Sequence, residues 1–333
     1  MKSHSIIPIF LPELACPHQC VFCNQKNITA TEKLPSEKEV SEIIESHLKT
    51  IKAENRTCEI AFFGGSFTGL PLHEQEKYLK LAAPYVENAE IEGIRLSTRP
   101  AYINDEILSL LKQYHVKIIE IGAQSMDEDV LRLSGRGHSA EDVRNAAKLI
   151  KEGGFILGIQ FMVGLPGDKP EKTYTTAKEI INLGADGTRI YPVLVIDDTE
   201  LAEMYKAGDY EPLSIEEAVL QTAPIYRLFE ENGVMIYKCG LHPSEFLYNG
   251  KLMAGPWHPA FRQLVQSKNF LDKAEKLLED DPEIKGFEVN PSDINAALGF
   301  EKGNLKVFQM KNTEFRILQN ANVKKGEIHA LHT

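Results

Sequence analysis

Three cysteines lie within eight residues near the N-terminus, in the stretch CPHQCVFC that contains Cys16, Cys20 and Cys23. The rest of the chain holds only two more, Cys58 and Cys239. An odd total with three members crowded into one loop does not suit a disulfide framework. Thiolates this close together are metal ligands or redox groups, so the question is which centre needs three of them.

Three kinds of centre fit part of this pattern. A structural zinc site needs four protein ligands, and the nearest fourth donor, His18, lies inside the loop itself. A redox pair of Cys20 and Cys23 leaves Cys16 without a role. An iron–sulfur cubane held by three cysteines leaves one iron without a protein ligand. That open iron is a place where a small molecule can coordinate.

The spacing Cys-x3-Cys-x2-Cys, with Phe22 directly before the last cysteine, resembles the signature of the radical S-adenosylmethionine (SAM) superfamily. The resemblance implies a [4Fe–4S] cluster on Cys16, Cys20 and Cys23, whose unique iron binds the amino and carboxylate groups of SAM. One-electron reduction would then cleave SAM to methionine and a 5′-deoxyadenosyl radical, which abstracts a hydrogen atom from the substrate. The electron would come from an external donor such as a flavodoxin or a ferredoxin.

Two further stretches carry SAM contacts that the resemblance implies. Gly64, Gly65 and Ser66 follow a predicted strand, and in the superfamily this turn offers backbone groups to the SAM amino group. Ser97 ends another strand in the stretch Leu96–Pro100, where relatives often carry a glutamate.

Three polar side chains near later strand ends complete the candidate set. Gln124 has an amide that can donate and accept at once, which suits a ribose diol. Arg136 can hold the methionine carboxylate in a bidentate pair. Gln160 is a further candidate for the ribose. The alternative for Gln124 is a buried amide that satisfies backbone groups, and the alternative for Arg136 is a solvated loop charge.

Short apolar runs alternate with amphipathic helical patterns in the first part of the chain. The predicted strands are 6–10, 59–63, 94–98, 117–123, 155–163 and 188–195. Ser36 with Glu39 predicts a capping box, and Ser139 predicts another helix start. Six such units indicate an α/β fold with a parallel sheet, either a partial (β/α)6 TIM-type barrel or a doubly wound sheet. We expect the partial barrel, with a C-terminal α+β extension.

The pattern changes after residue 195, so we expect three parts. They are a radical SAM partial barrel (1–195), a radical SAM C-terminal extension (196–250) and a small accessory segment (251–333). The second part should contain a long helix from Ser214 and a seventh strand at Val234–Lys238. In the third, Lys306–Met310 and Phe315–Gln319 predict a hairpin, and we expect this segment to help close the barrel opening.

A closer resemblance is to the radical SAM domain of the catalytic subunit of Elongator and to short bacterial relatives. The stretches that carry it are Ser97–Pro100, Ile121–Ser125, Gly135–His138, Tyr191–Val195 and Met204–Tyr210. The residues after 250 do not have the pattern of an acetyltransferase domain, so a reaction that uses acetyl-CoA is not expected from this chain alone. By analogy, the resemblance makes tRNA a candidate substrate and partner, with modification of a tRNA base as the activity.

Two alternatives remain open. The Ile-Gly-x-Gln-Ser and Gly-Leu-Pro-Gly stretches are also similar to oxygen-independent coproporphyrinogen III oxidase, which implies a small-molecule substrate. The C-terminal patterns differ from that family, so RNA is preferred over a porphyrin. The second alternative is a non-catalytic iron–sulfur protein, which would not form 5′-deoxyadenosine.

The composition sets further bounds. The formal net charge of −11 argues against broad, non-specific nucleic-acid binding but leaves room for a local basic patch. No apolar run has the length of a membrane span, and residues 1–10 are too short and polar for a signal peptide, so we expect a cytoplasmic protein with no membrane partner. Cys239, His242 and Trp257 could face a substrate, but packing roles are favoured for Cys239 and Trp257.

Overall fold

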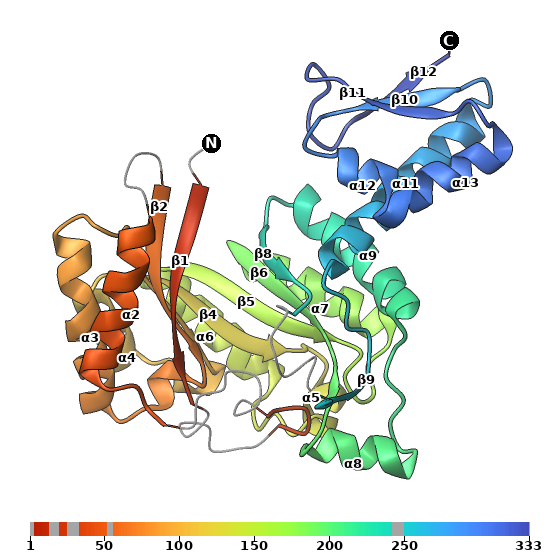
Figure 1. Cartoon of the computed structure of the whole chain (residues 1–333). Helices are drawn as coiled ribbons and strands as arrows, with labels where there is room; N and C mark the ends of the chain where they lie inside the picture. Colours follow the sequence, from red (N-terminus) through yellow and green to blue (C-terminus); the bar gives the residue numbers. More distant parts are fainter. Residues whose placement is uncertain (1–2, 13–19, 25–32, 52–55, 242–249, 333) are drawn as a thin grey trace.

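The computed structural model describes residues 3–12, 20–24, 33–51, 56–241 and 250–332 (Figure 1). Its main element is a seven-stranded sheet in the order β1-β2-β3-β4-β5-β6-β8, with every neighbouring pair parallel. The strands are β1 (Ser3–Leu11), β2 (Arg56–Gly64), β3 (Gly93–Thr98), β4 (Val116–Gln124), β5 (Ile156–Val163), β6 (Gly187–Pro192) and β8 (Met235–Cys239). The predicted seventh strand is therefore present as β8.

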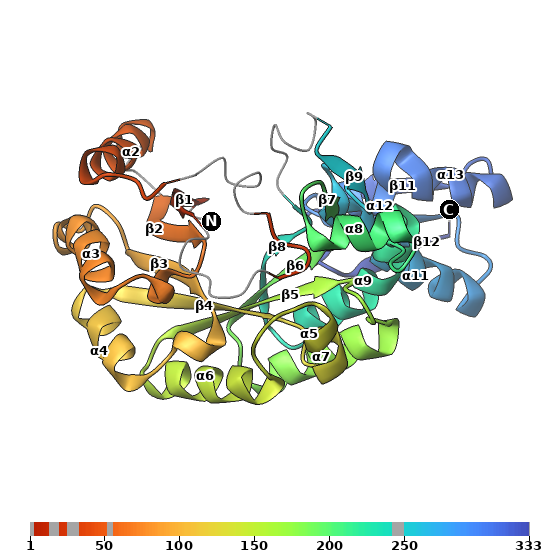
Figure 2. The ribbon, with the colours of Figure 1, turned by 90° about the horizontal axis from the view of Figure 1, so that it is seen from below.

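The helices cover one face of this curved sheet. They include α2 (Glu37–Thr50), α3 (Leu72–Glu87), α4 (Asp105–Gln113), α5 (Glu128–Leu133), α6 (Ala140–Glu152), α7 (Pro170–Asn182) and α9 (Ile215–Glu231), with short 3-10 turns η2 (Phe67–Gly69) and η3 (Pro100–Tyr102). Helix α8 (Glu200–Ala207) is not part of this layer, because its Leu201 and Ala202 pack with Val193 and Val195. Figure 2 shows α3, α4, α6 and α7 around the convex side. A strand order that never reverses, with helices on the outside, is a partial barrel and not a doubly wound sheet. The predicted fold class is confirmed.

Local signals start the helices where the sequence predicts. Ser36 Oγ accepts from the Glu39 backbone N–H, and the Glu39 carboxylate accepts in return from the Ser36 N–H. Ser139 forms the same capping box with Asp142. Each box satisfies backbone donors that the first helical turn leaves free.

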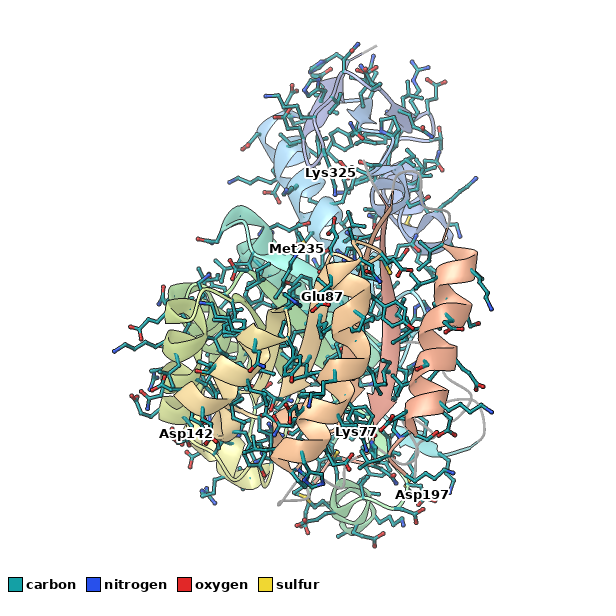
Figure 3. All side chains as sticks on the ribbon, turned by 90° about the vertical axis from the view of Figure 1, so that its left-hand side faces the viewer. Lys77, Glu87, Asp142, Asp197, Met235 and Lys325 are labelled. Carbon is teal, nitrogen blue, oxygen red and sulfur yellow. The ribbon has the colours of Figure 1, made fainter. Side chains whose placement is uncertain are left out.

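The outer layer is polar. Lys77 and Glu87 on α3 and Asp142 on α6 are labelled on this surface in Figure 3. Within the described ranges, no helix combines the length and the apolar character that crossing a membrane requires.

The C-terminal residues form a lobe with its own apolar core. Its elements are α11 (Phe261–Asp280), β10 (Gly286–Val289), α12 (Ile294–Leu298), η4 (Phe300–Lys302), α13 (Gly303–Lys311), β11 (Arg316–Gln319) and β12 (Ile328–Leu331). The predicted hairpin is wrong, because residues 306–310 lie in α13, and β11 pairs with β10 instead. Asn304 and Phe308 are buried four residues apart, which is helical spacing, and a short apolar run does not distinguish helix from strand.

This lobe lies away from the cysteine loop. The Asp197 carbonyl accepts a hydrogen bond from Asn24 Nδ2 of that loop at 3.1 Å. Figure 3 shows Asp197 at one end of the molecule and Lys325 of the lobe at the other. The expectation that the whole C-terminal segment closes the opening is therefore wrong. Only its first strand, β9 (Leu252–Ala254), lies near the loop, paired with β7 (Val195–Ile196) (Figure 1).

Candidate functional site

The described part of the cysteine motif, residues 20–24, is tied to two distant segments. The Val21 N–H donates to the Ser134 carbonyl at 3.2 Å, just before the Gly-Arg-Gly-His stretch. The Val21 carbonyl accepts from the Leu201 N–H at 2.8 Å, at the start of α8. Ser134 directly precedes the Gly135–His138 stretch, and Leu201 lies three residues before the Met204–Tyr210 stretch, so the fold brings these motifs close to the cysteine loop.

The same loop also packs against an apolar cluster. The buried members of this cluster are Val21, Val130, Leu165, Val193, Val195, Leu201 and Ala202. Phe22 is partly buried against it. The aromatic residue before the third cysteine thus packs the loop onto the barrel, while its predicted contact with the cofactor stays a prediction.

Two arginines approach the Cys20 sulfur. Arg136 Nη1 donates to Cys20 Sγ at 3.0 Å, and its Nη2 donates to the Gly122 carbonyl at 2.6 Å. Arg99 Nη1 is 4.0 Å from the same sulfur, and its Nη2 donates to the Arg136 carbonyl. Arg99, Arg136 and Cys20 are 4%, 5% and 5% exposed. Burial lowers the pKa of Arg136, but a guanidinium remains charged in proteins.

These two arginines lack the partners that the other buried arginines have. Arg95 contacts Glu59 and Glu120, and Arg189 contacts Glu120. Among the described residues, neither Arg99 nor Arg136 has an ion pair with a carboxylate. Because buried charges are normally paired, the two guanidiniums beside Cys20 suit an anion.

The charged network around Glu120 lies deeper in the barrel. Arg95 Nη1 and Arg189 Nη2 each donate to Glu120 Oε1, at 2.9 and 3.0 Å. Gln160 Nε2 donates to Glu120 Oε2 at 3.1 Å, and Ser97 is the register partner of Glu120 on β3. Burial opposes ionisation of Glu120, but the two guanidiniums outweigh it, so its pKa lies below the ordinary value. The SAM contacts of Gln160 and Ser97 remain predictions.

Gln124 lies beside Arg136 at the end of β4. Its φ of 69° is rare for a residue with a side chain, and the strand register shifts between Gly122 and Gln124. A Cβ on Gly122 would lie 2.9 Å from Gln124 Nε2 and 3.4 Å from Arg136 Nη2. Gln124 Oε1 and Arg136 Nε are buried without a hydrogen-bond partner among the described residues. One acceptor and one donor are therefore available to a ligand at this strand end.

His138 is a neutral imidazole beside the same group. Burial, and then the charges of Arg136 and Arg99, lowers its pKa from 6.5 to about 3. His138 Nε2 lies 3.2 Å from the Ala123 carbonyl, so the ring proton belongs on Nε2. Nδ1 is then a buried acceptor that no described residue satisfies. Sequence reasoning quoted His138 but assigned it no role.

The Gly-Gly turn is fixed against β1. Gly64 has a φ of 102°, and the Gly65 N–H donates to the Leu11 carbonyl at 2.9 Å. Ser66 is buried next to them. The approach of β1 explains Gly64, and the contact of Gly64 and Gly65 with SAM remains a prediction.

The predicted residues thus divide into groups. Cys20, Arg136 and Gln124 meet at the C-terminal ends of the strands, whereas Ser97 and Gln160 lie toward Glu120. Cys16 lies outside the described residues. Sequence reasoning missed Arg99, although a lone arginine after the apolar strand β3, directly before a proline, was an available signal.

The late polar residues agree with packing roles where they are described. Cys239 is buried in the main core, and burial raises the pKa of its thiol to about 12, so it is protonated. Trp257 packs against Leu194 and Ile196. His242 lies outside the described residues.

Comparison with known proteins decides the family. A model described as the radical SAM superfamily matches residues 14–180, which is half of the chain. This chain belongs to the radical SAM superfamily. A second model, the radical SAM C-terminal domain, matches residues 185–270. The family brings a [4Fe–4S] cluster and SAM as cofactors, and an anionic cluster and a carboxylate suit Arg99 and Arg136, which have no carboxylate partner in the described part of the chain.

Individual relatives of this radical SAM protein agree with the predicted resemblance. The chain is 29% identical to the tRNA uridine(34) acetyltransferase of Methanocaldococcus infernus, over 48% of this chain and 34% of that protein. It is 31% identical to human Elongator complex protein 3, over 51% of this chain and 35% of that protein. The chain therefore spans about a third of the length of these relatives.

Solved structures support the fold. The archaeal Elp3 of Methanocaldococcus infernus, with an N-terminal deletion, superposes with a TM-score of 0.66 at 21% identity, over 83% of this chain and 64% of that one. Coproporphyrinogen III oxidase from Escherichia coli gives a TM-score of 0.51 at 19% identity, over 70% and 53% of the two chains. At these identities the likeness concerns the architecture alone.

Proposed function

We propose that this protein is a radical SAM enzyme that binds a [4Fe–4S] cluster through Cys16, Cys20 and Cys23 and modifies a base of tRNA. When bound and reduced by one electron from an external donor, the cluster supplies reductive cleavage of SAM to methionine and a 5′-deoxyadenosyl radical, which takes a hydrogen atom from the substrate.

The observation that carries the proposal is the setting of Cys20. Its sulfur is buried at the strand ends with Arg136 Nη1 at 3.0 Å and Arg99 Nη1 at 4.0 Å, and no described carboxylate pairs with either arginine. A structural cysteine in an apolar core needs no such charges. An anionic centre that includes this thiolate does need them.

The surrounding residues would orient SAM. Gln124 Oε1 offers a buried acceptor and Arg136 Nε a buried donor, which suit a ribose hydroxyl and a carboxylate. The Gly64–Ser66 turn would offer backbone groups to the amino group, and β9 with α8 would limit water at this end of the barrel.

The tRNA part of the proposal comes from the relatives. One of them is named tRNA uridine(34) acetyltransferase, and another is named Elongator complex protein 3. The chain covers only about a third of each relative, so base modification is proposed without the acetyl transfer that the name of the first relative describes.

The test is product formation by the anaerobically reconstituted protein. Dithionite and SAM are added with or without bulk tRNA, and 5′-deoxyadenosine is followed by chromatography. We expect product that tRNA increases and that disappears in Cys20→Ala. Cys58 is a buried cysteine near the start of β2, at the other end of the strand from Gly64. Cys58→Ala is therefore the matched control and should keep the product.

Two results would contradict the proposal. Product that persists in Cys20→Ala would mean that SAM cleavage does not depend on this cluster. A fully loaded protein that forms no product even with tRNA would point to a binding or storage role. Stimulation by coproporphyrinogen instead of tRNA would keep the chemistry but overturn the substrate.

A further inference from the structure

We propose that Arg136, assisted by Arg99, raises the reduction potential of the cluster by acting on the Cys20 ligand. The inference rests on the proposed function, because it assumes that Cys20 binds the cluster. It goes further by assigning to two residues a role that does not involve SAM or the substrate.

The geometry fixes the Arg136 guanidinium on the sulfur. Nη1 donates to Cys20 Sγ at 3.0 Å while Nη2 donates to the Gly122 carbonyl at 2.6 Å, so the strand β4 orients the fork. Arg99 Nη1 lies 4.0 Å from the same sulfur, and Arg99 Nη2 donates to the Arg136 carbonyl. The two side chains support each other's positions.

The physical effect follows from charge and burial. Arg99 and Arg136 are 4% and 5% exposed, so water screens their charges poorly. Reduction adds one electron, taken from an external donor, to a centre whose Cys20 sulfur already carries negative charge. A hydrogen bond to that sulfur and two nearby cations stabilise the reduced state more than the oxidised one. The potential is thereby higher, and a physiological donor reduces the centre more easily.

The ion-pair pattern of the barrel distinguishes this pair from ordinary structural arginines. Arg95 and Arg189 share Glu120, and Arg95 also contacts Glu59, so their charges are largely offset. Arg99 and Arg136 have no described carboxylate partner, and their positive charge is directed at Cys20. The unbalanced charge is what acts on the cluster.

The test is a redox titration of the loaded protein, with the reduced cluster followed by its EPR signal in the absence of SAM. For Arg136→Gln, the ratio of reduced to oxidised cluster at a fixed potential should fall at least about tenfold, or ~59 mV for a one-electron couple. Arg99→Gln should shift in the same direction by less. Arg132→Gln is the matched control, because Arg132 is exposed, pairs with Asp129 and should leave the ratio unchanged.

The outcomes separate this inference from the proposed function. Wild-type protein that takes up no [4Fe–4S] cluster would overturn the proposed function. Arginine variants that load a cluster with the wild-type potential would overturn the inference alone. If Arg136→Gln loads no cluster, Arg99→Gln, which also removes a positive charge near Cys20, is titrated and must fall below the wild-type potential.

A stability measurement decides the remaining case, in which no arginine variant loads a cluster. Cluster-free Arg136→Gln should then melt at or above the temperature of cluster-free wild type, because it lacks an uncompensated buried charge. A cluster-free variant that is unfolded would show that Arg136 serves the fold instead, and the inference would fail.

Discussion

Gly64 has a backbone conformation that other residues rarely adopt, and the space for a side chain is filled. Its φ is 102°, and a Cβ would lie 2.2 Å from the Leu11 carbonyl oxygen. Both obstacles come from the place where β1 and β2 end side by side, at the candidate site.

Gly64→Ala should therefore lower the free energy of unfolding by about 2–5 kcal/mol, from backbone strain and a backbone clash. Gly208→Ala is the control, since Gly208 also has a positive φ of 81° but nothing lies within 4 Å of its Cβ position. It should cost only about 1 kcal/mol. If denaturant unfolding shows the same loss of stability in Gly64→Ala and Gly208→Ala, the contact with Leu11 is unimportant.

His138 makes the stability depend on pH. Its pKa is about 3 in the folded protein and 6.5 ordinarily, so between these values the unfolded chain binds a proton that the folded chain does not. The contribution of the neutral, buried imidazole to the free energy of unfolding is complete above pH 6.5. Below that pH it decreases by about 1.4 kcal/mol for each unit by which the pH falls.

His138→Gln should remove this part of the pH dependence. The measurement is denaturant unfolding at pH 7 and at pH 5, compared between wild type and variant. An unchanged slope in His138→Gln would mean that the buried imidazole is not the group that titrates.

The cysteine loop and helix α8 act together at the level of elements. Leu201, the second residue of α8, is fully buried and packs in the same apolar cluster as Val21, while its N–H donates to the Val21 carbonyl. The extension that follows the barrel thus supports the loop that carries the cysteines.

Leu201→Ala should cost about 2–5 kcal/mol of stability and weaken retention of the cluster about tenfold. The readout is the rate of iron loss to a chelator from the reconstituted protein. Leu79→Ala, equally buried in the main core on α3, should cost similar stability without faster iron loss. Equal iron loss in both variants would attribute the effect to general destabilisation.

At the scale of the whole molecule, one helix joins the apolar core of the barrel to the apolar core of the C-terminal lobe. Phe261 and Val265 of α11 belong to the barrel core, whereas Phe270 and Ala274 belong to the core of the C-terminal lobe. In that lobe the Phe287 ring contacts the rings of its neighbours at centroid distances of 5.2 to 6.2 Å. The predicted boundary at residue 250 stays a prediction, and the change of core occurs within α11.

Phe287→Ala should cost about 3–5 kcal/mol within the lobe. Because the lobe lies away from the cysteine loop (Figure 1), we expect faster proteolysis after residue 280 with unchanged iron content. Leu318→Ala, on the exposed side of β11, should alter neither. Loss of the cluster in Phe287→Ala would show that the lobe supports the site.

The sequence by itself determined the features that depend on neighbours along the chain. Ser36 and Ser139 cap helices because their partners are three residues away, and the apolar runs became parallel strands in sequential order. The cysteine spacing indicated the family for the same reason. The hairpin failed because a short apolar run near residue 308 fits a helix and a strand equally well.

Tertiary structure alone decided which charges surround Cys20. Arg99 and Arg136 are 79 and 116 residues away from it along the chain. No local pattern shows that Arg95 and Arg189 are paired with carboxylates while these two have no carboxylate partner in the ranges that the structure describes. That difference depends on which side chains the curved sheet brings together, and it is what makes the surroundings of Cys20 suitable for an anionic centre.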